Sequence, residues 1–170
     1  VWLKNRTLAY SNLLYDSVRG VGSGKALSSD NTVAEGGAGI SDNATNGFVS
    51  ALDTGGFTVT KGTGGSYTNV SGSSFIGWQW KGSGTTVSNT TGSITSTVCV
   101  NPTAGFSVVT YTTPASGVFT VGHGLGVAPS FIINRIKTIT NNWYCYHVSL
   151  GNGAELVFNT TAASASNSDW

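Results

Sequence analysis

Two stretches of the chain, VWLKNRTLAYSNLLYDSVRG at residues 1–20 and IINRIKTITNNWYCYHVSLG at residues 132–151, align without a gap. Each begins with an apolar run, and one constant offset along both stretches brings Gly20 level with Gly151. In both, apolar and polar residues alternate with the period of two that indicates β-strands. The repeat predicts the same strand–turn–strand unit twice. Its long period favours tandem domains of about 130 residues over a short-period solenoid.

The rest of the chain continues the period-two pattern, and helical periodicity is nearly absent. Turn-forming residues recur at intervals of about 8 to 15 residues, which favours an antiparallel sandwich over βαβ units. The segment 21–46 is rich in Gly, Ser and Asp and is expected to be a long loop. Strands are expected at residues 1–6, 12–18, 56–60, 74–81, 92–100, 105–112, 117–121, 131–137, 143–148 and 154–159.

The predicted fold is therefore all-β, with antiparallel β-sandwich modules of jelly-roll or lectin-like type in tandem. Residues 1–100 are interpreted as the later part of one repeat unit, and residues 101–170 as the early part of the next. The chain would then be a segment of a longer polypeptide, because the lead of the second copy at 122–131 has no counterpart before Val1. An open apolar face is expected, and neighbouring strands or chains would cover it. Its expected members are Phe106, Val108, Ile133 and Phe158.

The composition excludes several classes of function. Only 9% of residues are charged, the net charge is +1, and the eight Lys and Arg residues are scattered, which argues against nucleic-acid binding. No apolar stretch approaches the length of about 18 residues that a membrane helix needs. Cys99 and Cys145 define neither a disulfide framework nor a metal site, and we expect both to be free, buried thiols.

Catalytic residues are not indicated, and no metal or cofactor is expected. His123 lies between glycines in GHGLG, where a turn residue is the simplest interpretation. Asp16 lies near Arg19, but the repeat aligns this carboxylate with His147 and so does not preserve the pair. A local ion pair therefore explains Asp16 better than a glycosidase carboxylate does.

Two tryptophans, Trp78 and Trp80, share one face of an expected strand with Ile76, and this pattern predicts that both are buried in the core.

The repeat also sorts the aromatic residues of the second copy. Tyr144 and Tyr146 align with apolar-face positions of the first copy and are expected to face the core. Trp143 and His147 align with polar positions and are expected to face solvent. Trp143 and His147 are therefore the candidate ligand-binding residues.

Several motifs occur in the order of a known family. They resemble a repeated β domain of uncharacterised virion proteins of marine and other tailed phages. The motifs are VWLKNR (1–6), LLYDSVRG (13–20), FIGWQWKGSG (75–84), VSNTTGSITSTVCVNPTAGFSVVTYT (87–112), VGHGLGVAPSFIINR (121–135) and NNWYCYHVSLG (141–151).

The resemblance implies a structural or tail-fibre-like protein at the virion surface, and it supplies no catalytic residues. The expected function is a structural module that forms a homo-oligomer and contacts other virion protein subunits. The alternative is a carbohydrate-binding adhesin domain that contacts a host surface glycan. A tailspike of the endoglycosidase type is a third and weaker interpretation, because it needs two facing carboxylates.

Overall fold

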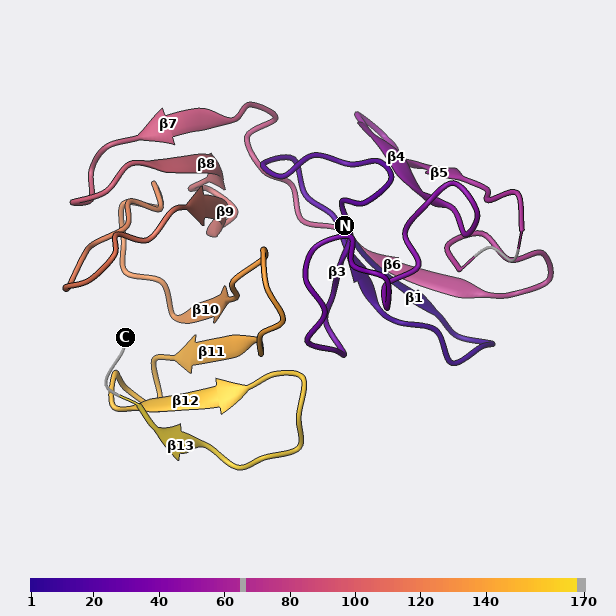
Figure 1. Cartoon of the computed structure of the whole chain (residues 1–170). Coiled ribbons are helices and arrows are strands. Elements are labelled where there is room, and N and C mark those ends of the chain that lie inside the picture. The colour runs from indigo at the N-terminus through magenta and orange to yellow at the C-terminus, as the bar shows by residue number, and fades with distance from the viewer. Residues whose placement is uncertain (65–66, 168–170) are drawn as a thin grey trace. The chain divides into compact units, whose positions relative to one another are not determined.

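The fold is all-β and antiparallel, as predicted. The computed structural model describes residues 1–64 and 67–167, and no helix occurs within them. The strands form four small sheets, of order β3-β2-β1-β6, β10-β11-β12-β13, β7-β8-β9 and β4-β5 (Figure 1). They are β1 (Trp2–Asn5), β2 (Leu13–Leu14), β3 (Leu27–Ser28), β4 (Phe48–Asp53), β5 (Gly56–Thr60), β6 (Phe75–Trp78), β7 (Val87–Asn89), β8 (Ser96–Asn101), β9 (Phe106–Tyr111), β10 (Phe131–Asn134), β11 (Tyr144–His147), β12 (Ala154–Val157) and β13 (Ala165–Ser166).

Most expected strands are present, and the differences have physical causes. Strand β4 was not expected, because a register shift between Val49 and Ala51 breaks its alternation. The unexpected strands β3, β7 and β13 are too short to show a periodicity, and β3 lies within the loop expected at 21–46. The strand expected at 117–121 is wrong: only Val121 forms an isolated bridge, and the side chain of Val118 is fully exposed.

The chain divides into two compact units. The first consists of Val1–Tyr15, Val21–Trp78 and Pro129–Trp170, and the second of Asp16–Gly20 and Gln79–Ala128. The boundary expected between residues 100 and 101 falls at the end of β8, which pairs with β9 over its full length. The division into compact units therefore does not follow that boundary, and the assignment of 1–100 and 101–170 to successive repeat units stays a prediction.

The sequence repeat is reproduced in the strand register. Strand β1 pairs with β2 through Trp2↔Leu14 and Leu3↔Leu13. Strand β10 pairs with β11 through Ile133↔Cys145 and Asn134↔Tyr144, and each of these positions is related to its counterpart by the offset of the sequence repeat. The next strands, β3 and β12, extend both sheets in the same order. Both copies are thus three-stranded antiparallel meanders with one register.

Hydrogen bonds outside the ladders repeat as well. The Asn12 amide donates to Oδ1 of Asp30 at 2.8 Å, and the Trp143 amide donates to Oδ1 of Asn159 at 2.8 Å. The donors Asn12 and Trp143 keep the offset of the repeat, whereas Asn159 comes slightly earlier in the chain than that offset would place it. The connection after the second strand is therefore shorter in the second copy, and the third strand returns to the same place.

The two copies bury opposite faces of this common sheet. In the first copy Leu13 is 3% exposed and Tyr15 is 1% exposed. In the second copy the neighbouring position, Cys145, is buried instead, whereas Tyr144 and Tyr146 are half-buried. The core of the first copy consists of Leu3, Leu13, Tyr15, Ala26, Ile40 and Val49, with Val1, Val21, Val33, Phe48, Phe57 and Val59 packed around them.

The buried carboxylate of Asp42 joins Tyr15 of this core to the backbone at Lys25 and Ala26. Oδ1 of Asp42 accepts a hydrogen bond from the Tyr15 hydroxyl at 2.9 Å. Its Oδ2 accepts from the amides of Lys25 at 2.8 Å and Ala26 at 2.6 Å. Burial raises the pKa of Asp42 above its ordinary value of 3.8, because desolvation outweighs these hydrogen bonds.

Replacing Asp42 with alanine removes the acceptor of three donors. We expect the free energy of unfolding to fall by about 3 kcal/mol, measured by urea unfolding at pH 7. Asp42→Asn keeps one acceptor oxygen and should lose less. A loss for Asp42→Ala of no more than about 0.5 kcal/mol, the usual range for surface changes, would contradict this role.

The raised pKa of Asp42 should make the folded state less stable as the pH rises through the acidic range. Because the folded state binds the Asp42 proton more tightly, its contribution to the free energy of unfolding falls as the pH rises from below 3.8 through the folded-state pKa. Urea unfolding across that window, compared with Asp42→Asn, measures this contribution. An unchanged pH profile in the variant would show that another group titrates there.

Candidate functional site

Trp143 is buried, so the expectation that it faces solvent is wrong. Only 6% of the residue is exposed, and its indole Nε1 donates to the backbone carbonyl of Ser28 at 2.7 Å. The guanidinium carbon of Arg135 lies 5.0 Å from the centre of the indole ring, in cation–π geometry. Trp143 therefore supports the fold at a contact between the two copies.

Arg135 completes this contact, and sequence reasoning missed its role. Its guanidinium donates to the carbonyls of Ser28 and Asn31, both at 3.1 Å, and also to the carbonyl of Val33. The Lys137 ammonium pairs with Glu35 at 3.0 Å. The only signal in the sequence was the alignment of Arg135 with Lys4, which marks a shared charge but not the loop that it binds.

His147 is exposed, as expected, but it forms no site with Trp143. Its Nδ1 accepts a hydrogen bond from the Ser149 amide at 3.2 Å, and its ring lies 6.3 Å from that of Phe131. The extended chain between Trp143 and His147 spans roughly 13 Å. One of the two candidate residues is thus structural, and the other shapes a turn.

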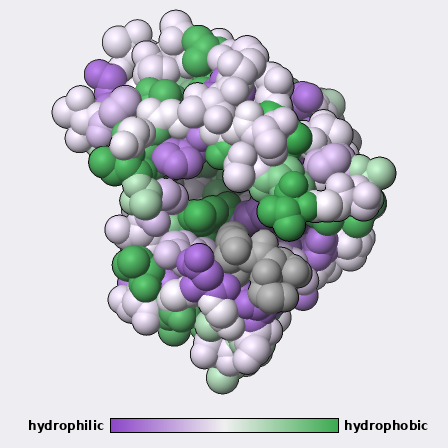
Figure 2. Space-filling view, turned by 90° about the vertical axis from the view of Figure 1, so that its left-hand side faces the viewer, coloured by the Kyte–Doolittle hydropathy of each residue, from purple (hydrophilic) through white to green (hydrophobic). Residues whose placement is uncertain are grey.

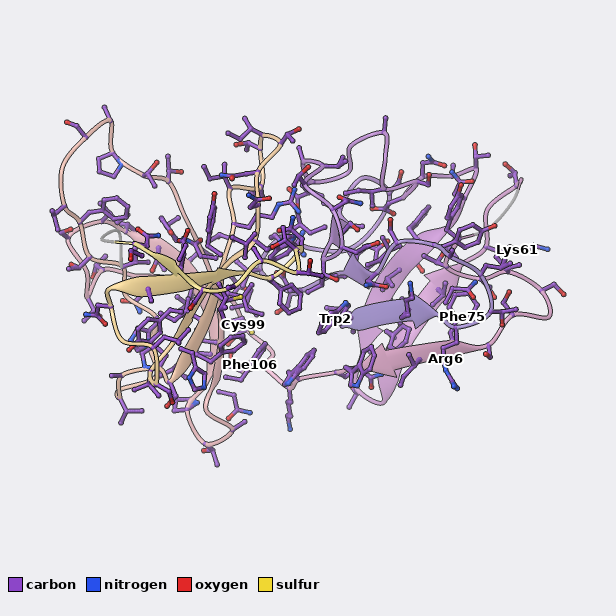
Figure 3. The ribbon with its side chains drawn as sticks, turned by 90° about the horizontal axis from the view of Figure 1, so that it is seen from below. Trp2, Arg6, Lys61, Phe75, Cys99 and Phe106 are labelled. Atoms are coloured by element: carbon purple, nitrogen blue, oxygen red, sulfur yellow. The ribbon has the colours of Figure 1, made fainter. Side chains whose placement is uncertain are left out.

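An aromatic cluster that the sequence did not predict lies on the first unit. It consists of Trp2, Trp78 and Phe158. The ring of Trp2 lies 5.4 Å from that of Trp78 and 5.7 Å from that of Phe158. Trp78 is 43% exposed, so its predicted core position is wrong, and the Trp2 indole donates to Ser29 Oγ at 3.1 Å. Figure 3 labels Trp2 and Phe75, which lie at opposite ends of the β1–β6 pair.

Trp80 is exposed too, against the prediction that it is buried in the core. It belongs to the second unit, where its ring stacks on that of Phe106 with centres 6.0 Å apart. A strand that ends at Trp78 leaves Trp80 outside the sheet, which is why the period-two pattern failed here.

An apolar row runs across one face of the second sheet. It consists of Phe131, Ile133, Leu156 and Phe158. Ile133 pairs with Cys145, which pairs with Leu156, so all three share a face. Phe131 is 51% exposed and Ile133 is 40% exposed. The exposure expected for Ile133 and Phe158 is confirmed, whereas Phe106 and Val108 are half-buried.

Only 9% of the residues of the chain are charged. Figure 2 shows one face of the molecule, on which hydrophilic and hydrophobic residues are both scattered among near-neutral ones. In the described residues no three His, Cys, Asp or Glu side chains gather as a metal-binding group. In the same part of the chain, no helix has the length and hydrophobicity needed to span a membrane.

The second unit carries a shallow depression of about 580 Å³ lined by Thr91, Gly92 and residues 120–124 and 126–128. His123 lies there, and its Nδ1 accepts a hydrogen bond from the Leu125 amide at 3.1 Å, which confirms the interpretation as a turn residue. Asp16 and Arg19 form the predicted local ion pair, at 2.5 Å. These groups therefore have structural roles.

Both cysteines are free and buried, as predicted. Burial raises the pKa of Cys145 to about 11, which keeps its thiol protonated at neutral pH. For Cys99, burial acts in the same direction, but hydrogen bonds from Ser17, Ser83 and Gly84 outweigh it and lower the pKa. Figure 3 labels Cys99 on β8 and Phe106 on β9.

The comparisons with known proteins identify one family. The family described as Domain of unknown function (DUF7483) matches residues 1–170. The chain belongs to this family. No curated protein and no solved structure matches it. The family match covers both copies of the repeat and both compact units of this DUF7483 domain.

Replacement of Trp143 should lower the free energy of unfolding far more than replacement of His147. Trp143→Ala removes a buried indole and should lower the free energy of unfolding by about 3–5 kcal/mol. His147→Ala, on the neighbouring strand β11, serves as the control and should change it by less than about 0.5 kcal/mol. Urea unfolding of both variants measures the difference. Similar losses in both would contradict the assigned roles.

Proposed function

We propose that this DUF7483 domain is a structural module of a bacteriophage virion that assembles with other copies of itself through the apolar row. The observation that carries the proposal is the exposure of large apolar side chains along one sheet face. Monomeric proteins rarely expose contiguous apolar surface of this kind. A protein partner that covers the row would remove it from water.

The energetics favour association at this face. Complete burial of a large apolar side chain contributes about 1.5–3 kcal/mol, and the members of the row are already partly covered. About 1 kcal/mol remains to be gained from each of Phe131, Ile133, Leu156 and Phe158. Few charged groups would lose solvation on contact, because only 9% of the residues are charged.

The assignment to a virion rests on the resemblance to the repeated β domain of tailed-phage proteins. On this proposal the partners are other virion protein subunits, the oligomer contains identical chains, and the domain is located at the particle surface. The finer architecture, sandwich modules in tandem, belongs to the same proposal. The identical register of the two meanders supports it.

Light scattering coupled to size-exclusion chromatography tests the assembly. The native domain should elute as an oligomer, and Ile133→Ser or Phe131→Ser should shift it to the monomer with an unchanged circular dichroism spectrum. Val118→Ser is the matched control, because it replaces a fully exposed valine outside the apolar row. A native domain that stays monomeric at about 100 μM, well above the Kd of a micromolar interface, would refute the proposal.

A second candidate function is carbohydrate binding, and the aromatic cluster specifically favours it. Exposed indole faces stack on the apolar faces of sugar rings, and Trp78 presents such a face beside Trp2. The Trp2 indole is held by its hydrogen bond to the buried Ser29 hydroxyl, which fixes the ring beside Trp78. In this alternative, the aromatic cluster binds a host surface glycan.

A glycan array followed by calorimetry distinguishes the two functions. If the domain is an adhesin, Trp78→Ala should abolish glycan binding or weaken it at least tenfold without changing the oligomeric state. Phe131→Ala, an exposed aromatic residue outside the aromatic cluster, should keep the affinity. Absence of any glycan signal from the native domain would remove this alternative.

A further inference from the structure

The second sheet carries another surface, on the face opposite the apolar row. We call it the tyrosine face, and its members are Ile132, Asn134, Tyr144, Tyr146, Glu155 and Val157. The pairs Ile132↔Tyr146 and Tyr144↔Val157 place them on one side of the sheet. We propose that the tyrosine face is the docking site for a β-hairpin of a partner polypeptide, with the side-chain chemistry of β4–β5.

The first copy shows how this face is covered. Ala26 and Ser28 are fully buried there, as Tyr15 nearly is. The hairpin β4–β5 supplies Val49, Phe57 and Val59 to the core that covers them. A hairpin is therefore the natural partner of this sheet face. When the strands are matched by their register, the residues of the first copy that correspond to the tyrosine face are Val1, Leu3, Leu13, Tyr15, Ala26 and Ser28.

In the second copy the same face remains accessible. Ile132 is 36% exposed, and Tyr144, Tyr146 and Val157 are only half-buried. The strand register is identical to that of the first copy, so the backbone needs no change to accept the same type of occupant. The two sheets differ in their fourth strand, which is β6 beside β1 in the first copy and β13 beside β12 in the second, but the three-stranded meanders that carry this face have one register.

The size of the tyrosine face fits a hairpin better than a whole second domain. Strands β10, β11 and β12 have four residues each, which gives a face of roughly 10 by 13 Å. A stable interface between two domains buries about 800 Å² on each partner, several times this area. A two-stranded hairpin of the length of β4–β5 covers it.

The chemistry of the first copy also specifies the occupant. The hairpin should present aliphatic or aromatic side chains at alternate positions, as Val49, Phe57 and Val59 do. It should be preceded by an acidic residue, because Tyr146 aligns with Tyr15, whose hydroxyl donates to Asp42. The partner is thus a polypeptide with an acidic residue shortly before an apolar β-hairpin, at the spacing of Asp42 from β4.

This inference does not depend on the proposed function, because the two surfaces lie on opposite faces of the second sheet. Variants of the tyrosine face and variants of the apolar row therefore report on them separately. Failure of hairpin docking would leave self-association through Ile133 and Phe131 untouched, and the reverse also holds.

The probe is a synthetic peptide with the sequence of residues 39–64, added to the full chain and followed by calorimetry. A second arm appends the sequence of residues 42–64 after Trp170, the position that aligns with Ser41 when the third strands of the two copies are matched. We expect the peptide to bind, or the appended chain to unfold at a higher urea concentration than the native chain. The matched control carries serine in place of Val49, Phe57 and Val59 in the added sequence only.

The variants Tyr146→Ser and Ile132→Ser should abolish peptide binding and the gain in urea midpoint, while circular dichroism confirms that the sheet is intact. Two outcomes would overturn the proposal. One is no effect in either arm. The other is binding that survives both variants, which would show that the probe exchanges with the hairpin of the first copy.

Discussion

The contact between Arg135 and the loop after β3 is the interaction on which the first compact unit depends. A guanidinium is planar and always charged, and its N–H groups diverge in fixed directions. Here it meets the carbonyls of Ser28, Asn31 and Val33 on one side and the Trp143 ring on another. Since three carbonyls must converge on one cation, the loop has little freedom. The two meanders are thereby joined through a side chain of one and the backbone of the other.

This contact explains why two sheets of one register bury opposite faces. A β-strand presents two equally regular faces, and its alternation does not say which of them is covered. In the first copy the hairpin β4–β5 covers the face of Leu13 and Tyr15. In the second copy the loop held by Arg135 covers the opposite face at Trp143, and Cys145 is buried on that face. Which face of each sheet is buried therefore depends on the segment that packs against it, and that segment is set by the tertiary structure.

The sequence was therefore more informative about the backbone than about the exposure of its aromatic side chains. The repeat predicted that the strand pairs of the two copies have the same arrangement, and the equal registers of β1–β2 and β10–β11 confirm this. The turn features were predicted as well, because the ion pair of Asp16 and the hydrogen bond of His123 join residues close in sequence. The burial of Trp143 depends on the loop at Ser28, and Trp78 lies against Trp2, so both environments are set by distant segments of the chain. The period-two pattern of apolar and polar residues contains no information about contacts with distant segments.

The candidate sites exist because the faces of the second sheet are only partly covered by the rest of the chain. A sheet whose two faces were both covered would offer nothing to a partner, and a sheet with neither covered would be too small to be stable in water. The second meander lies between these limits: the Arg135–Trp143 contact covers one end of one face, and large side chains remain accessible on both faces. With few charges in the chain, most of its polar groups are hydroxyls, amides and backbone groups of the turns. Exposed apolar side chains also occur outside the strands, as at Val118 and Val127, but on the second sheet Phe131, Ile133 and Leu156 share one face. A protein partner gains more by covering such a shared face than by covering an isolated side chain.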